Sequence, residues 1–185
     1  MMSGRRLPPL VPSQLDARQR ALYDDIVGGP RKAGNLIAAD GSLRGPFDLM
    51  LRSPEVGTPL QQLGAALRFG ASLDDDLREL AILLTAATWE SDFEWAVHQP
   101  LAESAGVPAA VLDAVRAGAP VVSDDERYVV VVQAAREAFR DRSVSASTFA
   151  ELHRTLGDRQ VVEVLTIFGY YTTLALLLNS YGIAP

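Results

Sequence analysis

The chain has 185 residues, about the size of one ordinary domain, and 48% of them are hydrophobic while 22% are charged. Its formal net charge of −6 disfavours nucleic acid and anionic membranes as partners, because both are bound chiefly by clustered lysine and arginine. It contains no cysteine, which excludes disulfides, thiolate metal ligands and thiol redox chemistry.

The N-terminal residues 1–12 predict an extended arm, because the three prolines in this stretch disfavour a helix. No apolar run follows its two arginines, so we expect no signal peptide and a cytoplasmic protein. Residues 13–185 are expected to form a single domain.

Helix-start signals and apolar residues at helical spacing recur along the rest of the chain. No convincing alternating strand pattern is found, so the predicted fold class is all-α. The predicted segments are, in order, a helix opened by Ser13–Asp16, a long ordered loop over 28–46, a short helix after Pro46, and helices over 54–69, 72–87 (continued or restarted up to 106), 108–117, 123–140, 145–156 and 158–180. The segment Ser72–Asp75 is expected to cap the helix over 72–87, and Ser123, with Glu126 three residues on, is expected to start the helix over 123–140.

The longest apolar run covers residues 161–178 and includes Glu163, Gly169 and two tyrosines. This composition favours a buried core helix over a membrane span. We therefore expect no membrane association.

A glutamate lies next to the apolar stripe of the helix predicted over 72–87. Glu79 has Ile82, Leu83 and Ala86 as its i+3, i+4 and i+7 neighbours. Its carboxylate is therefore at the edge of the stripe, paired to a cation such as Arg78, or directed into a pocket. Burial without a partner would cost several kcal/mol, on the order of a lost ion pair.

The next helix carries an acid and a histidine four residues apart. Glu94 and His98 share one helix face, and the face continues with apolar residues. The carboxylate could orient the imidazole and raise its pKa toward neutrality, which suits general acid/base catalysis. A solvated i,i+4 pair explains the same spacing equally well.

A metal site is not expected. Glu94, His98 and Glu79 could supply ligands, but the chain has only two histidines and no repeated metal-type spacing. The second histidine, His153, is predicted to lie on the surface or to be satisfied by neighbours. Nucleophile motifs, phosphate-binding loops and dinucleotide fingerprints are absent from the sequence.

Aromatic residues flank these positions. Trp89 and Trp95 are six residues apart and fall on different helix faces, so we expect one in the core and one at an interface or pocket. Tyr170 and Tyr171 follow Gly169 within an apolar helix, which favours close packing or room for a ligand there, with plain helix packing as the alternative.

The stretch LRELAILLTAATWESDFEWAVHQPLAESAGVPAAVLDAVRAG resembles the core motif of the carboxymuconolactone decarboxylase family, which also contains alkylhydroperoxidase D. The later GDRQVVEVLTIFGYYTTLALLLNSYGI is similar to the C-terminal helix of the longer members. Together the two stretches and their surroundings cover roughly residues 45 to 183. The resemblance implies an all-α alkylhydroperoxidase D-like fold that assembles into homo-oligomers, trimers or hexamers, with sites between helices.

The resemblance also implies positions for the site. The peroxidase branch of the family uses a glutamate followed by Cys-x-x-Cys-x-x-x-His. Aligning its histidine with His98 places the glutamate at Glu79 and the two cysteines at Ser91 and Glu94. Peroxide reduction by disulfide cycling is therefore not expected, because neither a hydroxyl nor a carboxylate supplies a thiolate.

The decarboxylase branch requires neither cysteine nor cofactor, and this sequence resembles that branch more. By this resemblance His98, oriented by Glu94, would donate a proton, and Glu79 would act as a second acid/base or hold the histidine. A cation such as Arg44 or Arg68 is expected near a substrate carboxylate. The residues expected to contact the substrate are Ser91, Trp95, Tyr170 and Arg44.

The predicted function is a lyase or isomerase that needs no cofactor and acts by acid/base chemistry on a small carboxylated or carbonyl-bearing metabolite. The main alternative is a non-catalytic, oligomeric binding or scaffold protein that kept the fold after losing the redox pair. A hydrolase or a metal-assisted variant is a third hypothesis. Family resemblance alone does not identify the reaction.

Overall fold

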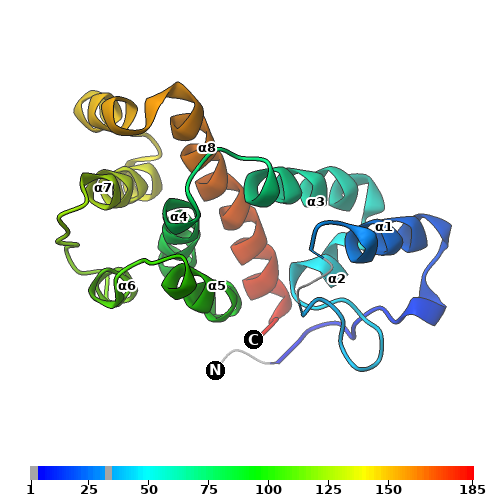
Figure 1. The fold of residues 1–185 in the computed structure, drawn as a ribbon. Helices are drawn as coiled ribbons and strands as arrows, with labels where there is room; N and C mark the ends of the chain where they lie inside the picture. The colour runs from blue at the N-terminus through cyan, green and yellow to red at the C-terminus, as the bar shows by residue number, and fades with distance from the viewer. Residues whose placement is uncertain (1–3, 32–34) are drawn as a thin grey trace. The chain divides into compact units, whose positions relative to one another are not determined.

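The computed structural model describes residues 4–31 and 35–185. These residues form helices and no strand, and one isolated β-bridge joins Ile37 and Leu43 within the predicted loop (Figure 1). The all-α prediction is thus confirmed for the described part of the chain. Its helices are η1 Pro12–Gln14, α1 Ala17–Gly28, α2 Pro46–Met50, α3 Pro54–Phe69, α4 Asp75–Thr88, α5 Asp92–Ser104, α6 Ala109–Arg116, α7 Glu126–Asp141 and α8 Ala146–Tyr181.

The chain divides into two compact units. Of the described residues, the first unit contains 4–31, 35–70 and 177–184, and the second contains 71–176 and 185. The expectation of a single domain over 13–185 stays a prediction.

In the first unit, a buried carboxylate holds the N-terminal arm. Asp48 is fully buried and accepts hydrogen bonds from the Leu10 N–H and the Arg5 guanidinium, each at 2.6 Å. Arg52, one turn further along, lies 3.3 Å from the same carboxylate. The described arm residues, 4–11, contain no helix.

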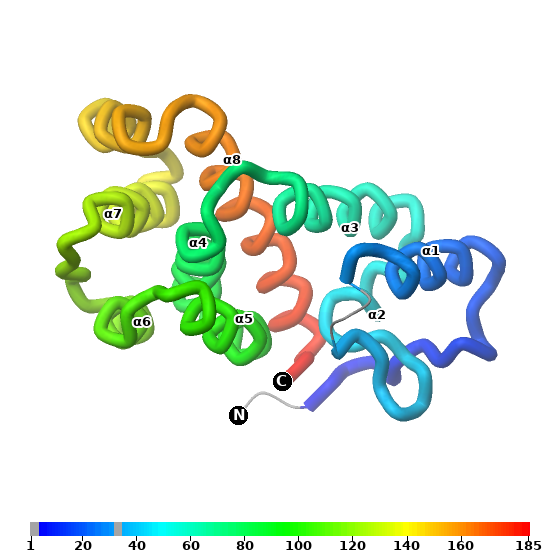
Figure 2. Tube along the Cα trace, in the orientation of Figure 1, coloured from blue at the N-terminus to red at the C-terminus, as the bar shows by residue number. Residues whose placement is uncertain are grey.

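Helices α1 and α2 both contact α3 within this unit, and Figure 2 shows α1 alongside α3. The helix α1 begins one turn later than the sequence predicted. Its N-cap is Asp16, which forms a capping box with Gln19, rather than Ser13. The predicted short helix at Pro46 and the helix over 54–69 are both confirmed.

A close backbone approach between α2 and α3 makes Gly57 sensitive to substitution. A Cβ atom at this position would lie 2.2 Å from the Met50 carbonyl oxygen, which is backbone and cannot rotate away. We expect Gly57→Ala to lower the free energy of unfolding by about 1–3 kcal/mol through overpacking. Urea denaturation measures this. Gly169→Ala is the matched control, because a Cβ there meets no atom within 4 Å and the alanine should be neutral or stabilising.

In the second unit, α4 is surrounded by α5, α6 and α7 (Figure 1). The sequence predicted an apolar stripe on one side of this helix. Instead, every residue from 77 to 86 is buried, including Arg78 and Glu79. The stripe prediction was too narrow, because neighbouring helices cover α4 on more than one side.

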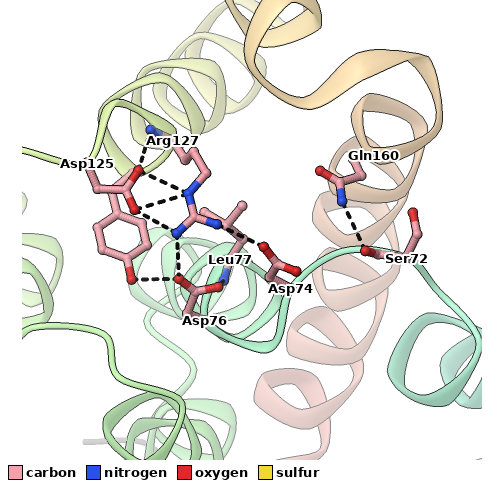
Figure 3. Close-up of polar contacts among 8 residues, drawn as sticks. Ser72, Asp74, Asp76, Leu77, Asp125, Arg127 and Gln160 are labelled. Atoms are coloured by element: carbon pink, nitrogen blue, oxygen red, sulfur yellow. Dashed lines mark hydrogen bonds and ion pairs between the residues drawn. The ribbon is translucent and has the colours of Figure 1, made fainter.

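Charged residues join the start of α4 to the start of α7. The Arg127 guanidinium contacts Asp74 at 2.8 Å, Asp76 at 3.2 Å and Asp125 at 2.7 Å (Figure 3). Tyr128 donates its hydroxyl to Asp76 at 2.8 Å. This cluster fixes the first turn of α4, which directly precedes Glu79.

The caps of these helices differ from the predicted ones. The N-cap of α4 is Asp74 rather than Ser72, whose N–H and hydroxyl both donate to Glu163 of α8. The N-cap of α7 is Asp125 rather than Ser123. For Ser72, hydrogen bonds to a residue of another helix replace the local capping bond that the sequence predicted.

The helix restarts between α4 and α5. After α4 ends, Glu90 adopts a left-handed conformation with φ of 49°, and Ser91 becomes the N-cap of α5. The Ser91 N–H donates to the Ala86 carbonyl at 2.9 Å, which closes the end of α4. The sequence left continuation and restart open, and the structure shows a restart.

The last helix, α8, bends at Gly157, where φ is +75°. This position separates the two helices predicted over 145–156 and 158–180. By length and composition α8 could span a membrane, with a mean hydropathy of 1.8 and half of its apolar window buried. Its buried residues, which contribute to the core as predicted, include Val161, Val164, Ile167, Phe168, Tyr170, Tyr171, Leu174 and Ala175.

Candidate acid/base site

A buried glutamate and histidine meet across α4 and α5. His98 Nδ1 lies 2.6 Å from Glu79 Oε2, and the two side chains are 3–4% exposed. They are 19 positions apart in the chain. The burial of all of α4 and the restart of the helix at α5 bring them together.

A second carboxylate approaches the other ring nitrogen. Glu94 Oε2 lies 3.4 Å from His98 Nε2, as their i,i+4 spacing predicted, and both side chains are buried. The imidazole is therefore flanked by two glutamates. The shorter contact comes from Glu79, so Glu79 rather than Glu94 is the residue best placed to orient the ring.

Arg78 adds a positive charge beside the cluster. Its Nε lies 3.4 Å from Glu79 Oε1, while its Nη1 donates to Asp75 at 2.8 Å. The alternative of pairing with a cation is thus confirmed, and the paired carboxylate is buried rather than at an exposed edge. Arg78 was named from the sequence as a possible partner, but no site role was predicted for it.

The protonation of His98 depends on two opposing effects. Burial of the ring lowers its pKa, but hydrogen bonds to Glu79 and Glu94 and their negative charges outweigh burial and raise the pKa of His98 above its ordinary value. The imidazolium form is thereby favoured more than it is in an ordinary histidine. A histidine in this state can donate a proton.

Two tyrosines of α8 form a chain of ring contacts that begins at His98. The Tyr171 ring contacts the His98 ring edge to face, with 5.3 Å between centroids, and Tyr170 contacts Tyr171 in the same way at 5.2 Å. Tyr170 is the tyrosine predicted from the sequence to contact the substrate, whereas the ring of Tyr171 contacts His98. Helical spacing could not decide between adjacent residues without knowing which face meets α5. The role of Tyr170 in substrate binding stays a prediction.

Two buried polar atoms of α5 have no hydrogen-bond partner within the described ranges 4–31 and 35–185. They are Ser91 Oγ and Glu94 Oε1, in residues that are 1% and 3% exposed. Buried polar atoms without a partner are rare in folded proteins. Both belong to positions that the sequence analysis assigned to the site.

The other two predicted substrate contacts have different surroundings. Trp95 is buried beneath Arg116, with the guanidinium 4.5 Å from the ring, and its indole N–H donates to Gln99. Arg44 belongs to the first unit, where it is exposed and its Nε lies 3.4 Å from the Ile37 carbonyl. Contact of either residue with substrate stays a prediction. His153 is half exposed and pairs with Asp158 at 2.8 Å, in line with its predicted surface role.

A groove of about 430 Å³ lies elsewhere in the second unit, between α7 and the first part of α8. Its lining includes Val129, Gln133, Glu126 and Arg154 and none of the residues of the buried cluster. Across the described residues, no group of three or more histidine, aspartate or glutamate side chains is arranged to hold a metal ion.

Comparison with known families identifies the segment that carries this cluster. The sequence model of the carboxymuconolactone decarboxylase family matches residues 54–137. This segment belongs to that family. It includes Glu79, Ser91, Glu94 and His98. The resemblance predicted from the sequence is confirmed for the carboxymuconolactone decarboxylase segment.

Solved structures show the same fold. An alkylhydroperoxidase AhpD core protein from Ralstonia eutropha JMP134, described as an uncharacterized peroxidase-related protein, has a TM-score of 0.76 at 16% identity, covering 100% of this chain and 94% of that one. A putative antioxidant defence protein AhpD from Agrobacterium tumefaciens has a TM-score of 0.61 at 14% identity, covering 72% and 93%. The carboxymuconolactone decarboxylase segment thus lies in an alkylhydroperoxidase D-like fold.

The apo debrominase Bmp8 has the same fold, with a TM-score of 0.68 at 14% identity and coverage of 94% of this chain and 88% of that one. A cysteine-to-alanine variant of Bmp8 was solved in complex with 2,3,4-tribromopyrrole. No curated protein matches the chain.

Proposed function

We propose that this protein is an enzyme that performs general acid/base chemistry without a cofactor, as a lyase or isomerase acting on a small carbonyl-bearing or carboxylated metabolite. The observation that carries the proposal is the buried row of Glu79, His98 and Glu94, with 2.6 Å between the first two. Membership of residues 54–137 in the carboxymuconolactone decarboxylase family supports it.

In this proposal the three side chains have different roles. Glu79 accepts the hydrogen bond of His98 Nδ1–H, which fixes the orientation of the ring and favours its protonated form. Nε2 then faces Glu94, and a proton can pass between this nitrogen and Glu94 Oε2. Glu94 Oε1, which has no partner among the described residues, is the oxygen directed to the substrate.

The two reaction types use this row in different ways. In an isomerisation, Glu94 removes a proton from a carbon next to a carbonyl, the electron pair moves to the carbonyl oxygen, and the proton returns at another carbon. In a decarboxylation, the electron pair of the breaking C–CO2 bond moves into the conjugated carbonyl. The resulting carbanion then takes a proton from the Glu94–His98 pair.

Thiol chemistry is not part of the proposal. The peroxidase-related and debrominase descriptions apply to the neighbouring proteins, and the Bmp8 complex was obtained with a variant in which a cysteine had been replaced. This chain has no cysteine. At one of the two positions aligned with the cysteines of the peroxidase branch, this chain has Glu94, and in this proposal its carboxylate serves as the acid/base group where a thiolate is absent.

The molecule is further proposed to be a cytoplasmic homo-oligomer, a trimer or hexamer, that binds a small molecule rather than nucleic acid or a membrane. Exposed apolar side chains on α5 and α8 support self-association, because such residues are commonly covered at interfaces. Its net charge of −6 supports the absence of nucleic acid. The exposed apolar residues are Val97, Leu101, Val162 and Leu176.

Deuterium exchange and CO2 release test the catalytic proposal. Small β-keto acids, unsaturated lactone acids and 1,3-diketones are incubated with the protein in D2O and followed by proton NMR. His98→Gln should lower the rate at least ~100-fold, the usual contribution of a general acid or base, whereas the surface control His153→Gln should stay within about twofold. Equal rates in wild type and His98→Gln for every compound would refute the proposal.

A non-catalytic binding or scaffold protein is the second candidate. The observation that favours it is the burial of Glu79, Glu94 and His98, each at most 3% exposed. A closed ion-pair cluster of this kind can serve to specify the fold alone. In that case no compound reacts, and substitutions at the cluster change only stability.

A further inference from the structure

The start of α5 has the sequence of a helix cap, but its side chains do not form the capping hydrogen bonds. Ser91-Asp-Phe-Glu94 matches the S-x-x-E capping box, in which each side chain bonds the other residue's backbone N–H. Here Ser91 is the N-cap, yet its side chain makes no capping bond. The Ser91 N–H bonds Ala86 instead of Glu94.

Both side chains instead leave a polar atom buried without a partner. Ser91 Oγ and Glu94 Oε1 bond neither each other nor any other described residue. An unsatisfied buried polar atom destabilises the folded state. A cap formed by these residues would instead stabilise the helix by bonding backbone N–H groups. Local energetics alone therefore does not explain this arrangement, whereas a ligand that bonds both atoms would.

The charges around these atoms indicate the kind of ligand. Glu94 lies 3.4 Å from His98 through Oε2, and its other oxygen, Oε1, is a buried acceptor without a hydrogen-bond donor among the described residues. A ligand group at Oε1 must therefore donate a hydrogen bond. An ionised carboxylate has no donor and would place a second negative charge beside Glu94, which is unfavourable in a buried site.

We propose that Ser91 Oγ and Glu94 Oε1 form a subsite for a neutral ligand group with a hydrogen-bond donor beside an acceptor, such as the enol of a carbonyl compound, and that the subsite rejects carboxylates. The donor bonds the Glu94 carboxylate, and the acceptor takes the Ser91 hydroxyl proton. This inference rests on the proposed function and selects its carbonyl-bearing substrates. The group that exchanges its proton would be the one held here.

Acetamide and acetate are the probes, because they have the same shape and differ in charge and in the N–H donor. Each is titrated into the full-length protein while the ring signals of His98 are followed by NMR, with His153 as the internal reference. Acetamide should shift the His98 signals in a saturable way. Acetate should bind at least about tenfold more weakly, which corresponds to about 1.4 kcal/mol.

Two variants locate the binding. Ser91→Ala should weaken acetamide binding about fivefold or more, as expected for the loss of one hydrogen bond, while the exposed control Ser143→Ala should leave it unchanged. Glu94→Gln removes the negative charge and should abolish the preference for acetamide over acetate. Circular dichroism shows whether each variant is folded. If Ser91→Ala does not fold, Glu94→Gln still tests the subsite, because this variant keeps Ser91.

The inference is overturned if acetate binds as tightly as acetamide, if Ser91→Ala binds acetamide normally, or if neither probe saturates, as expected when a buried water satisfies both atoms. These results do not depend on turnover. Selective acetamide binding without any deuterium exchange would refute the proposed catalysis alone. Exchange that requires His98 but not Ser91, with no probe selectivity, would refute the subsite alone.

Discussion

Replacing His98 by alanine is expected to lower the free energy of unfolding by about 3–5 kcal/mol at pH 7, the usual cost of removing one partner from a buried ion pair. The substitution leaves Glu79 and Glu94 buried and negatively charged without the imidazolium between them. Arg78 Nε still lies 3.4 Å from Glu79 Oε1. Urea denaturation of the wild type and the variant measures the difference.

Two comparisons isolate the charge effect of this substitution. His153→Ala removes an exposed histidine whose partner Asp158 is 93% exposed, so its cost should be about 0–1 kcal/mol. The double variant Glu79→Gln/His98→Ala removes one of the two stranded charges and should be more stable than His98→Ala. If His98→Ala costs no more than His153→Ala, the cluster is accessible to water and the buried acid/base row does not exist.

Removing the nearer carboxylate is expected to change the titration of His98 and its chemistry together. In Glu79→Gln the strongest contribution that raises the pKa of His98 is lost while burial still lowers it, so the pKa should fall. Less imidazolium and a poorly oriented ring should reduce proton exchange by ~100-fold or more. The ring signals of His98 and His153 in NMR titrations measure the two pKa values independently.

The same substitution should alter how stability depends on pH. The pKa of folded His98 is raised above its ordinary value of 6.5, so its stabilising contribution is complete below about pH 6.5 and is lost as the pH rises through the folded pKa. Glu79→Gln should remove this alkaline loss. A wild-type stability that is flat from pH 6 upward, or one that Glu79→Gln leaves unchanged, would contradict the assignment.

Local chemistry explains why much of the fold could be predicted. Prolines, glycines and apolar spacing act within a few residues, so the sequence predicted the helices at 46, 54–69 and 108–117 and the division of α8 at Gly157. The caps were less predictable. Ser72 and Ser13 are sound cap candidates, but Glu163 binds the Ser72 N–H, and Asp16 caps α1 one turn after Ser13.

The shared helix face of Glu94 and His98 follows from the sequence alone, because i,i+4 spacing brings side chains together in any α-helix. The lack of cysteine, which excludes thiol chemistry, is likewise evident from the sequence. The packing of the helices was needed to establish that Glu79 makes the shorter contact to His98 and that the Tyr171 ring contacts the His98 ring. These contacts join residues of different helices, whose rotation about their axes depends on the packing of the whole unit and on no local pattern.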